Sequence, residues 1–319
     1  MELNLNVFDD YTKSSLIKEG LLTSKIIFNH TELELRKKAN LTVSAARKVF
    51  IEASKISLLQ QNMKISNQVI TTGCEQIDIM LGGGLFQHGI TELSGESGCG
   101  KTQFCLQAAL TIQLPSSLKG AKSGAVYICT EDHFPSSRIQ QMINNLPSKY
   151  QNNSKIERLE VSQVDFGDNI LINLVTTVED LKKCIYSMLP KVLNHKSIKL
   201  IVIDSIAAVF RGEYEKNEMH RRSKDLRDIA CWLHKLSVRY GLWVICVNQV
   251  TSSLSDIGGK NLVPSLGLSW ANLVTTRLLM SKILSTRFLE VIFSPHAASK
   301  RIPFIVTDRG IEAREHIDS

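Results

Sequence analysis

Residues 95–102 have the sequence Gly95-Glu96-Ser97-Gly98-Cys99-Gly100-Lys101-Thr102. This octet fits the pattern G-x-x-x-x-G-K-[ST] of a loop that binds phosphate groups. The apolar run at 90–93 before it predicts a strand, and the run at 103–110 after it is typical of a helix. Because such a loop joins a strand to a helix, both neighbours support the match.

The residue types of the octet explain how it would hold a triphosphate. Its three glycines permit a tight turn with inward-facing backbone N–H groups, and the N-terminus of the following helix attracts anions. We expect Lys101 to reach the β- and γ-phosphates and the hydroxyl of Thr102 to hold Mg²⁺. A glycine-rich turn that fits the pattern by chance is the alternative, but the flanking strand and helix disfavour it. The octet therefore predicts nucleotide binding.

The composition predicts a soluble protein of a reducing compartment. The chain has 319 residues, 43% of them hydrophobic, enough for one large domain and a small one. No apolar run is long enough to cross a bilayer, and 1–4 lacks the positive charge of a signal segment, so no membrane partner is expected. The seven cysteines show no CxxC spacing, which favours reduced thiols in the core. The net charge of +7 suits a nucleic-acid partner without establishing one.

The hydrophobic pattern divides the chain into three parts. Residues 1–62 carry helical signals, including a capping box at Thr31 and Glu34, and predict a small helical domain. A linker is predicted at 63–70, and an α/β domain at 71–319. The α/β pattern consists of apolar runs at 125–129, 200–203 and 242–247, helical stretches at 178–189 and 225–240, and successive strands at 277–281, 288–293 and 303–306. We expect a mostly parallel sheet covered by helices and extended by antiparallel strands.

Polar residues that follow three of the predicted strands would complete a nucleotide site. Asp204 ends the second strand and is placed to hold Mg²⁺, with an ordinary helix cap as the alternative. Glu131 follows the first strand and can orient and deprotonate a water molecule, although Asp132 competes for this role. Gln249 follows the third strand and either reports the presence of the γ-phosphate or merely caps the strand.

These segments, together with the run at 265–272, resemble the RecA-type recombinases and in particular the eukaryotic recombinase paralogues, over about 71–313. The resemblance implies a RecA-like phosphate-loop ATPase core that uses ATP and Mg²⁺. It implies that 95–103, including Gln103, and Arg138 bind the nucleotide, with Arg138 stacked on adenine. It also implies that Glu131 activates water, that Lys101 takes part in catalysis, and that Gln249 couples the γ-phosphate to DNA binding.

The resemblance places two DNA-lining loops at about 211–222 and 251–264. The first carries Arg211, Arg221 and Arg222, which suit contacts to phosphates. The second contains Lys260 and has no aromatic residue to insert between bases. We therefore expect DNA contacts through the backbone phosphates.

The chain departs from the family pattern in its small helical domain. Residues 38–42 stand where a glycine hairpin would present N–H groups to DNA, which leaves binding by this hairpin open. Family members self-assemble through a Phe-x-x-Ala strand. Residues 50–53 fit these letters, but their pattern predicts the interior of a helix. Filament formation by this chain alone is therefore not expected.

The function implied by the resemblance is that of a paralogue in a heteromeric complex. Such a protein would bind ATP and single-stranded or branched DNA, pair with another recombinase paralogue and assist the main recombinase filament in repairing double-strand breaks and processing junctions. Its DNA-dependent ATPase activity would be slow, because the active site would be completed by a partner subunit. A nuclear location is implied, with a cytoplasmic pool left open. The alternatives are the strand-exchange recombinase itself and an adaptor that binds nucleotide without hydrolysing it.

Overall fold

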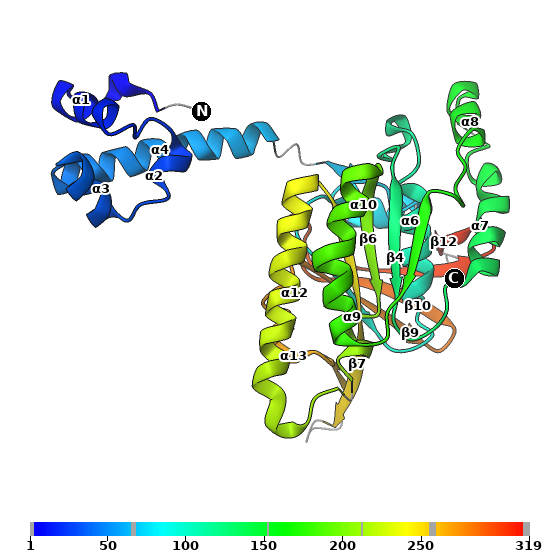
Figure 1. Ribbon diagram of the computed structural model, residues 1–319. Coiled ribbons are helices and arrows are strands. Elements are labelled where there is room, and N and C mark those ends of the chain that lie inside the picture. The colour runs from blue at the N-terminus through cyan, green and yellow to red at the C-terminus, as the bar shows by residue number, and fades with distance from the viewer. Residues whose placement is uncertain (1–2, 65–67, 152, 212, 255–259, 315–319) are drawn as a thin grey trace. The chain divides into compact units, whose positions relative to one another are not determined.

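The chain folds into two units, Met1–Gln68 and Val69–Ser319 (Figure 1). The computed structural model describes residues 3–64, 68–151, 153–211, 213–254 and 260–314. The predicted linker at 63–70 is narrower in the structure, because helix α4 continues to Lys64 and strand β1 begins at Val69.

The N-terminal unit consists of short helices around a small apolar core. Its elements are η1 (Leu5–Val7), α1 (Asp10–Lys18), α2 (Ser24–Ile27), α3 (Glu32–Ala39) and α4 (Val43–Lys64). The capping box forms at the start of α3, where the backbone N–H of Glu34 donates to Thr31 Oγ1 at 3.3 Å and that of Thr31 donates to Glu34 Oε2 at 2.7 Å. The predicted helical state of 50–53 is confirmed, because this segment lies inside α4 and Ala53 is fully buried.

The second unit is built on one large sheet. Its strands are β3 (Thr91–Gly95), β4 (Gly124–Cys129), β5 (Ile170–Leu174), β6 (Ile198–Asp204), β7 (Trp243–Leu254), β8 (Lys260–Pro264), β9 (Thr276–Ile283), β10 (Thr286–Phe293), β11 (Arg301–Thr307) and β12 (Gly310–Ala313). The strand order is β12-β11-β10-β9-β3-β7-β6-β4-β5, and β8 pairs with β7. The pairs from β9 to β5 are parallel and those from β9 to β12 antiparallel, so the predicted sheet is confirmed. A separate small sheet pairs β1 (Val69–Ile70) with β2 (Leu85–Phe86).

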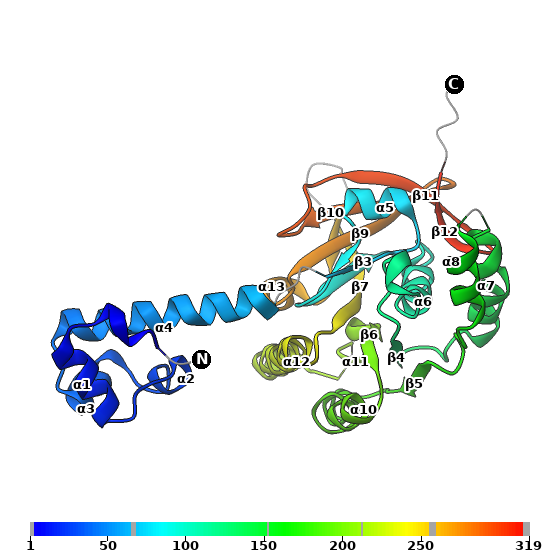
Figure 2. The same cartoon turned by 90° about the horizontal axis from the view of Figure 1, so that it is seen from above.

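Helices cover both faces of the large sheet (Figure 2). One face packs on α5 (Glu75–Met80), α6 (Lys101–Thr111), α7 (Ser136–Lys149) and α8 (Lys155–Ser162). The other packs on α9 (Val178–Lys183), α10 (Leu189–His195), α11 (Ile206–Val209), α12 (Met219–Tyr240) and α13 (Gly267–Ala271). Short turns η2 (Ser116–Leu118) and η4 (Lys216–Glu218) complete the unit, and a π-helical turn at Cys184–Met188 joins α9 to α10.

The alternation of side chains along the strands brings the predicted site residues together. The last apolar positions of β4, β6 and β7 in the core on the α6 side are Cys129, Val202 and Val247. Side chains on a strand repeat with a period of two, so the residues two positions later face α6 as well. Those residues are Glu131, Asp204 and Gln249. The sheet therefore delivers three polar side chains to the edge at which α6 begins.

Two predicted loops have regular structure, which corrects the sequence interpretation. Arg221 and Arg222 lie in the first turn of α12, because this helix begins at Met219. Residues 251–254 extend β7 and 260–264 form β8, so the second predicted loop is a β-hairpin whose tip lies outside the described residues. Six of the seven cysteines are buried, and Cys231 is exposed. No helix in the described part of the chain combines the length and apolar character that crossing a membrane requires.

Candidate nucleotide site

The predicted phosphate loop connects β3 to α6. Gly98 has a positive φ of 75° and open space where a side chain would lie. A Cβ at position 95 would approach the carbonyl oxygen of Met280 to 2.3 Å, so only glycine allows this contact between β3 and β9. Lys101 is 9% exposed, and its Nζ donates to the carbonyl oxygens of Gly95 at 2.8 Å and Glu96 at 2.7 Å. These carbonyls hold the ammonium directly over the loop.

The predicted magnesium ligands are in contact. Thr102 Oγ1 donates to Asp204 Oδ2 at 2.9 Å, and the hydroxyl of Tyr127 donates to the same oxygen at 2.7 Å. Burial raises the pKa of Asp204, while the hydrogen bonds from Tyr127 and Thr102 lower it less. Within the described ranges, no three His, Cys, Asp or Glu side chains are arranged so that they could hold a metal ion by themselves. One carboxylate beside one hydroxyl fits Mg²⁺, which binds one or two carboxylates and takes further ligands from phosphates and water.

Glu131 and Gln249 form a second polar group on the opposite wall. Gln249 Nε2 donates to both carboxylate oxygens of Glu131, at 3.0 and 2.8 Å. Arg211 Nη1 lies 3.3 Å from Glu131 Oε1, and Arg211 Nη2 donates to Gln249 Oε1. The side chain of Glu131 is 38% exposed and that of Arg211 is 59% exposed. This group therefore faces solvent, unlike the lysine of the phosphate loop.

Arg138 is held by partners from three parts of the fold. Its Nε donates to Gln103 Oε1 at 2.7 Å, and its Nη2 donates to the carbonyl oxygen of Thr307 at 2.6 Å. Its Nη1 donates to Gln141. These contacts fix the plane of the guanidinium, as a stacking surface for a base requires.

A cavity of about 520 Å³ joins these groups. Of the residues predicted to bind nucleotide or metal or to catalyse, its lining includes Ser97, Gly98, Gly100, Lys101, Thr102, Gln103, Glu131, Arg138, Asp204 and Gln249. Gly95, Glu96 and Cys99 do not line it, and Cys99 is fully buried beneath the loop. The volume is within the range of about 300–1,000 Å³ of small-molecule sites. The cavity and its donors fit a nucleotide with Mg²⁺.

Two residues of the site escaped the sequence analysis. Tyr127 lies within an otherwise apolar strand, and this one polar position was the available signal. Arg287 lines the cavity from β10, and its Nε is buried without a hydrogen-bond partner among the described residues. Arg287 lies on the same face of β10 as the buried Leu289 and Val291. A basic residue in line with buried apolar residues was the signal there. An unpartnered buried donor on the wall is a further reason to expect an anionic ligand.

A buried polar chain lies under the exposed wall. Glu92, fully buried in β3, pairs with Arg277 and accepts from Asn248 Nδ2 at 2.6 Å. Ser265 Oγ donates to Asn248 Oδ1 at 3.0 Å and contacts the carbonyl oxygen of Gln249 at 2.7 Å. This chain fixes the part of β7 that carries Gln249, because Ser265 contacts it at the base of the β7–β8 hairpin.

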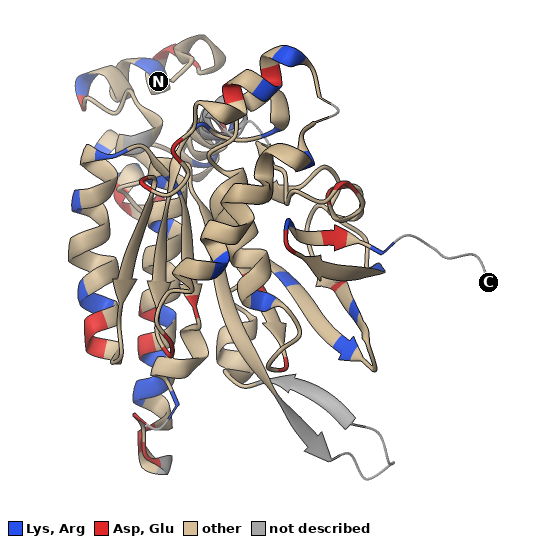
Figure 3. Ribbon diagram, turned by 90° about the vertical axis from the view of Figure 1, so that its right-hand side faces the viewer, with Lys and Arg blue, Asp and Glu red and all other residues tan. Residues whose placement is uncertain are grey.

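The residues predicted to bind DNA have separate surroundings. Arg221 pairs with Glu218 at 3.2 Å, and Arg222 Nη2 lies 3.4 Å from the carbonyl oxygen of Ser265. Basic and acidic positions lie side by side at the start of α12 (Figure 3). Lys260 begins β8, and its side chain lies outside the described part of the structure. Of the predicted set, Arg211 contacts the nucleotide site.

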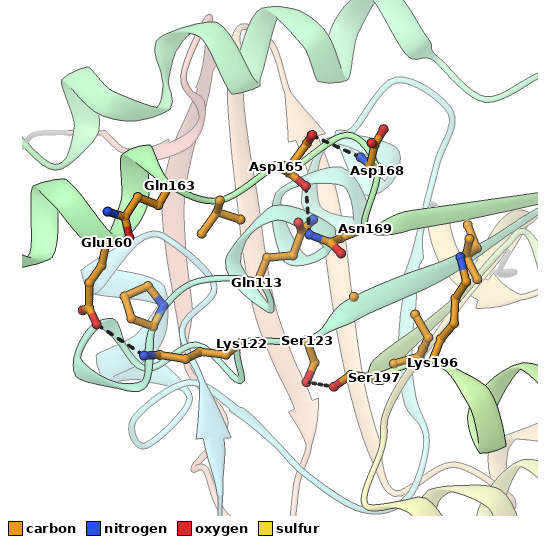
Figure 4. A pocket seen from close by; sticks show the side chains of 15 residues that line it. Gln113, Lys122, Ser123, Glu160, Gln163, Asp165, Asp168, Asn169, Lys196 and Ser197 are labelled. Atoms are coloured by element: carbon orange, nitrogen blue, oxygen red, sulfur yellow. Dashed lines mark hydrogen bonds and ion pairs between the residues drawn. The ribbon is translucent and has the colours of Figure 1, made fainter.

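A second cavity, of about 600 Å³, lies at the other ends of β4, β5 and β6 (Figure 4). Its polar lining includes the Lys122–Glu160 ion pair at 3.3 Å and the Ser123–Ser197 hydrogen bond at 3.0 Å. None of the residues predicted for nucleotide, metal or DNA lines it. The larger cavity therefore does not contain the predicted nucleotide site.

Comparison with known proteins identifies the family. The Rad51 family profile matches residues 64–314. The chain is 35% identical to DNA repair protein XRCC3 of Bos taurus over 77% of this chain and 74% of that protein. It is 31% identical to the XRCC3 homolog of Arabidopsis thaliana over 77% and 93% of the two chains. It is 29% identical to DNA repair protein rhp57 of Schizosaccharomyces pombe over 81% and 84%.

The runs at 89–93, 125–132 and 270–272 predict a likeness to the third X-ray-repair cross-complementing paralogue, XRCC3, ahead of the fungal mediator paralogue. The similarity to XRCC3 of several species confirms this resemblance. Members of the Rad51 and RecA families are DNA-dependent ATPases that bind ATP with Mg²⁺. The chain therefore belongs to the Rad51 family, as one of its paralogues in DNA repair and recombination.

Proposed function

We propose that this paralogue binds ATP with Mg²⁺ in the 520 Å³ cavity and hydrolyses it slowly within a heteromeric recombination complex. One observation carries the proposal. The phosphate loop, Asp204, Glu131 and Gln249 come from four different strands and converge on one cavity. Such convergence is what a phosphate-loop ATPase requires at the carboxyl ends of its strands.

Each group has a distinct role in this proposal. Lys101 moves from the loop carbonyls to the β- and γ-phosphates, and Thr102 and Asp204 hold Mg²⁺. Bound MgATP supplies the phosphoryl group that is transferred to water. Glu131 orients that water and accepts its proton, and Gln249 responds to the γ-phosphate. Arg138, with Gln103 beside it, stacks on the adenine.

The partners follow from the relatives and from the exposed wall. We propose that the chain binds single-stranded and branched DNA, pairs with another recombinase paralogue and assists the main recombinase filament in the nucleus. The relatives are named as DNA repair proteins and RAD51 homologs, which supports this role. Glu131 is 38% exposed, so a neighbouring subunit has room to complete the catalytic wall.

Purification of the full chain, alone and with a co-expressed paralogue, tests the proposal. Isothermal titration calorimetry should show MgATP binding in both cases, and turnover should rise with the partner and with DNA. Lys101→Ala should weaken MgATP binding and remove turnover, whereas Lys155→Ala, the same change at an exposed position on α8, should change neither.

Three outcomes would redirect the proposal. Regular filaments of the chain alone on single-stranded DNA, seen by electron microscopy, would favour the strand-exchange recombinase. Intact repair in cells together with lost hydrolysis in Lys101→Ala would favour an adaptor that binds nucleotide without hydrolysing it. Equal assembly and equal turnover with and without the partner would contradict the heteromeric role.

A further inference from the structure

We propose that Arg211 is shared between the nucleotide site and the DNA. Without DNA its guanidinium holds Glu131 and Gln249, and with DNA it turns to a backbone phosphate and releases them. This inference rests on the proposed function, which assigns Glu131 to hydrolysis and the segment before α12 to DNA. It makes Arg211 a positioning residue for Glu131 and gives a physical route from DNA binding to hydrolysis.

The contacts form a closed triangle of side chains from three elements. Arg211 follows α11, and its backbone N–H donates to the carbonyl oxygen of Ala208 at 3.0 Å. Its Nη1 lies 3.3 Å from Glu131 Oε1, and its Nη2 donates to Gln249 Oε1. Gln249 Nε2 closes the triangle on both oxygens of Glu131. One guanidinium thus contacts the two residues that are predicted to act on water and to report the γ-phosphate.

The contacts in this triangle engage both oxygens of the Glu131 carboxylate, which hydrolysis needs as a general base. A general base must offer a lone pair to the proton of the attacking water. Oε1 of Glu131 accepts from Gln249 and faces Arg211, and Oε2 accepts from Gln249. Release of Arg211 removes the cation from this carboxylate and frees Gln249 Oε1. The carboxylate then has capacity for the water.

The triangle can be displaced because it is exposed. The side chains of Arg211 and Glu131 are 59% and 38% exposed, and an exposed ion pair favours its closed form only about two- to fivefold. A nucleic-acid strand offers closely spaced phosphates and releases counterions when arginine binds. The planar guanidinium binds phosphate as well as carboxylate, so a strand can compete for it.

The neighbouring arginines lack this link. Arg221 pairs with Glu218 on its own turn, and Arg222 contacts the carbonyl oxygen of Ser265. Neither has a contact with Glu131 among the described residues. Arg211 is therefore the member of the predicted DNA set through which the two sites can communicate.

Fluorescence anisotropy of a labelled oligothymidylate on the full chain, without nucleotide, tests the inference at several salt concentrations. The variants are Glu131→Gln, Arg211→Gln and the two combined, with Arg239→Gln as the matched loss of charge at the far end of α12. Glu131→Gln should bind the strand about two- to fivefold more tightly, because it removes the ion pair that competes with phosphate for Arg211. Arg211→Gln should bind more weakly, with a log–log salt slope shallower by about 0.7. Arg239→Gln should match the wild type.

The combined variant decides between coupling and simple charge removal. In the Arg211→Gln background, Glu131→Gln should no longer change the affinity. An equal tightening in both backgrounds would overturn the inference, because it would reflect only the lost negative charge. A wild-type chain that binds ATP but no oligothymidylate would overturn this inference and the DNA part of the proposed function. A wild-type chain that binds the strand with additive variant effects would overturn this inference alone. Thermal unfolding of each variant checks that these exposed substitutions leave the fold intact.

Discussion

The two walls of the candidate nucleotide cavity are held in different ways. On the β3 and β6 wall, Lys101 is buried and Asp204 partly buried, with partners supplied by the loop carbonyls, Thr102 and Tyr127. On the opposite wall, Glu131 and Arg211 expose 38% and 59% of their side chains. The first wall is part of the packed core, so it is preorganised to bind. The second depends on weak polar contacts, so it is suited to switching.

The largest expected effect concerns the exposed wall. Glu131→Gln should lower the hydrolysis rate about 10²- to 10⁴-fold, the usual contribution of a general base. ATP affinity should stay within about twofold, because this wall does not grip the phosphates in our account. Asp132→Asn is the matched control, since this neighbouring carboxylate also lines the cavity. Single-turnover hydrolysis and calorimetry on the same samples separate the two effects. A greater loss with Asp132→Asn would transfer the catalytic role to Asp132.

The next effect concerns the buried wall. Lys101→Ala should weaken ATP binding about 10- to 100-fold, the equivalent of about 1.5–3 kcal/mol for hydrogen bonds to charged groups. It also leaves the loop carbonyls of Gly95 and Glu96 without their donor. Equilibrium binding of a fluorescent ATP analogue measures the change, with Lys155→Ala as the control. Retained affinity in Lys101→Ala would mean that the buried wall does not bind the nucleotide.

The ionised carboxylate of Asp204 should lower the free energy of unfolding of the nucleotide-free chain. Burial raises the pKa of Asp204 above its value in the unfolded chain. The ionised carboxylate therefore opposes folding, and this loss of stability grows as pH rises from the unfolded pKa through the folded pKa and is complete above it. At neutral pH, Asp204→Asn should raise the free energy of unfolding of the nucleotide-free chain by about 1 kcal/mol. Urea unfolding in EDTA measures this gain. An equal gain at a pH below both pKa values would contradict this origin.

The last expected effect, no larger than that of Asp204→Asn, concerns Tyr127. Tyr127→Phe removes the hydroxyl that donates to Asp204 at 2.7 Å and should lower the free energy of unfolding by about 1 kcal/mol. The loss should shrink in the Asp204→Asn background, because the hydroxyl then no longer faces an ionised carboxylate. Denaturant unfolding of the four chains gives this coupling. An unchanged loss would show that Tyr127 acts through packing alone.

The sequence predicted the residues at the ends of the strands on both walls better than the contact that links them to Arg211. The octet, Asp204 and Glu131 all lie at or just beyond the ends of parallel strands, so their positions follow from strand periodicity and parallel topology. The contact of Arg211 with Glu131 joins segments far apart in the chain through flexible exposed side chains, and no spacing reports it. Arg211 was therefore predicted only as a DNA contact.

Secondary structure was missed where the pattern was short or ambiguous. The strand β5 at 170–174 lies at the sheet edge and was not predicted, because its apolar run is only three residues long before Asn173 and does not distinguish a strand from a helix. The predicted loop at 211–222 hid the first turn of α12, since Arg221 and Arg222 fit either a loop or a helix. The element types in the core of the sheet were correct because those strands carry long apolar runs.

Calorimetric titration of ATP in the presence and absence of Mg²⁺ tests whether nucleotide and metal bind together between the phosphate loop and Asp204. The wild-type chain should bind ATP more tightly with Mg²⁺, and Asp204→Asn should bind it with little dependence on the ion, because Asp204 and Thr102 lie 2.9 Å apart beside the phosphate loop. Absence of ATP binding by the wild type, or an unchanged Mg²⁺ dependence in Asp204→Asn, would contradict the account.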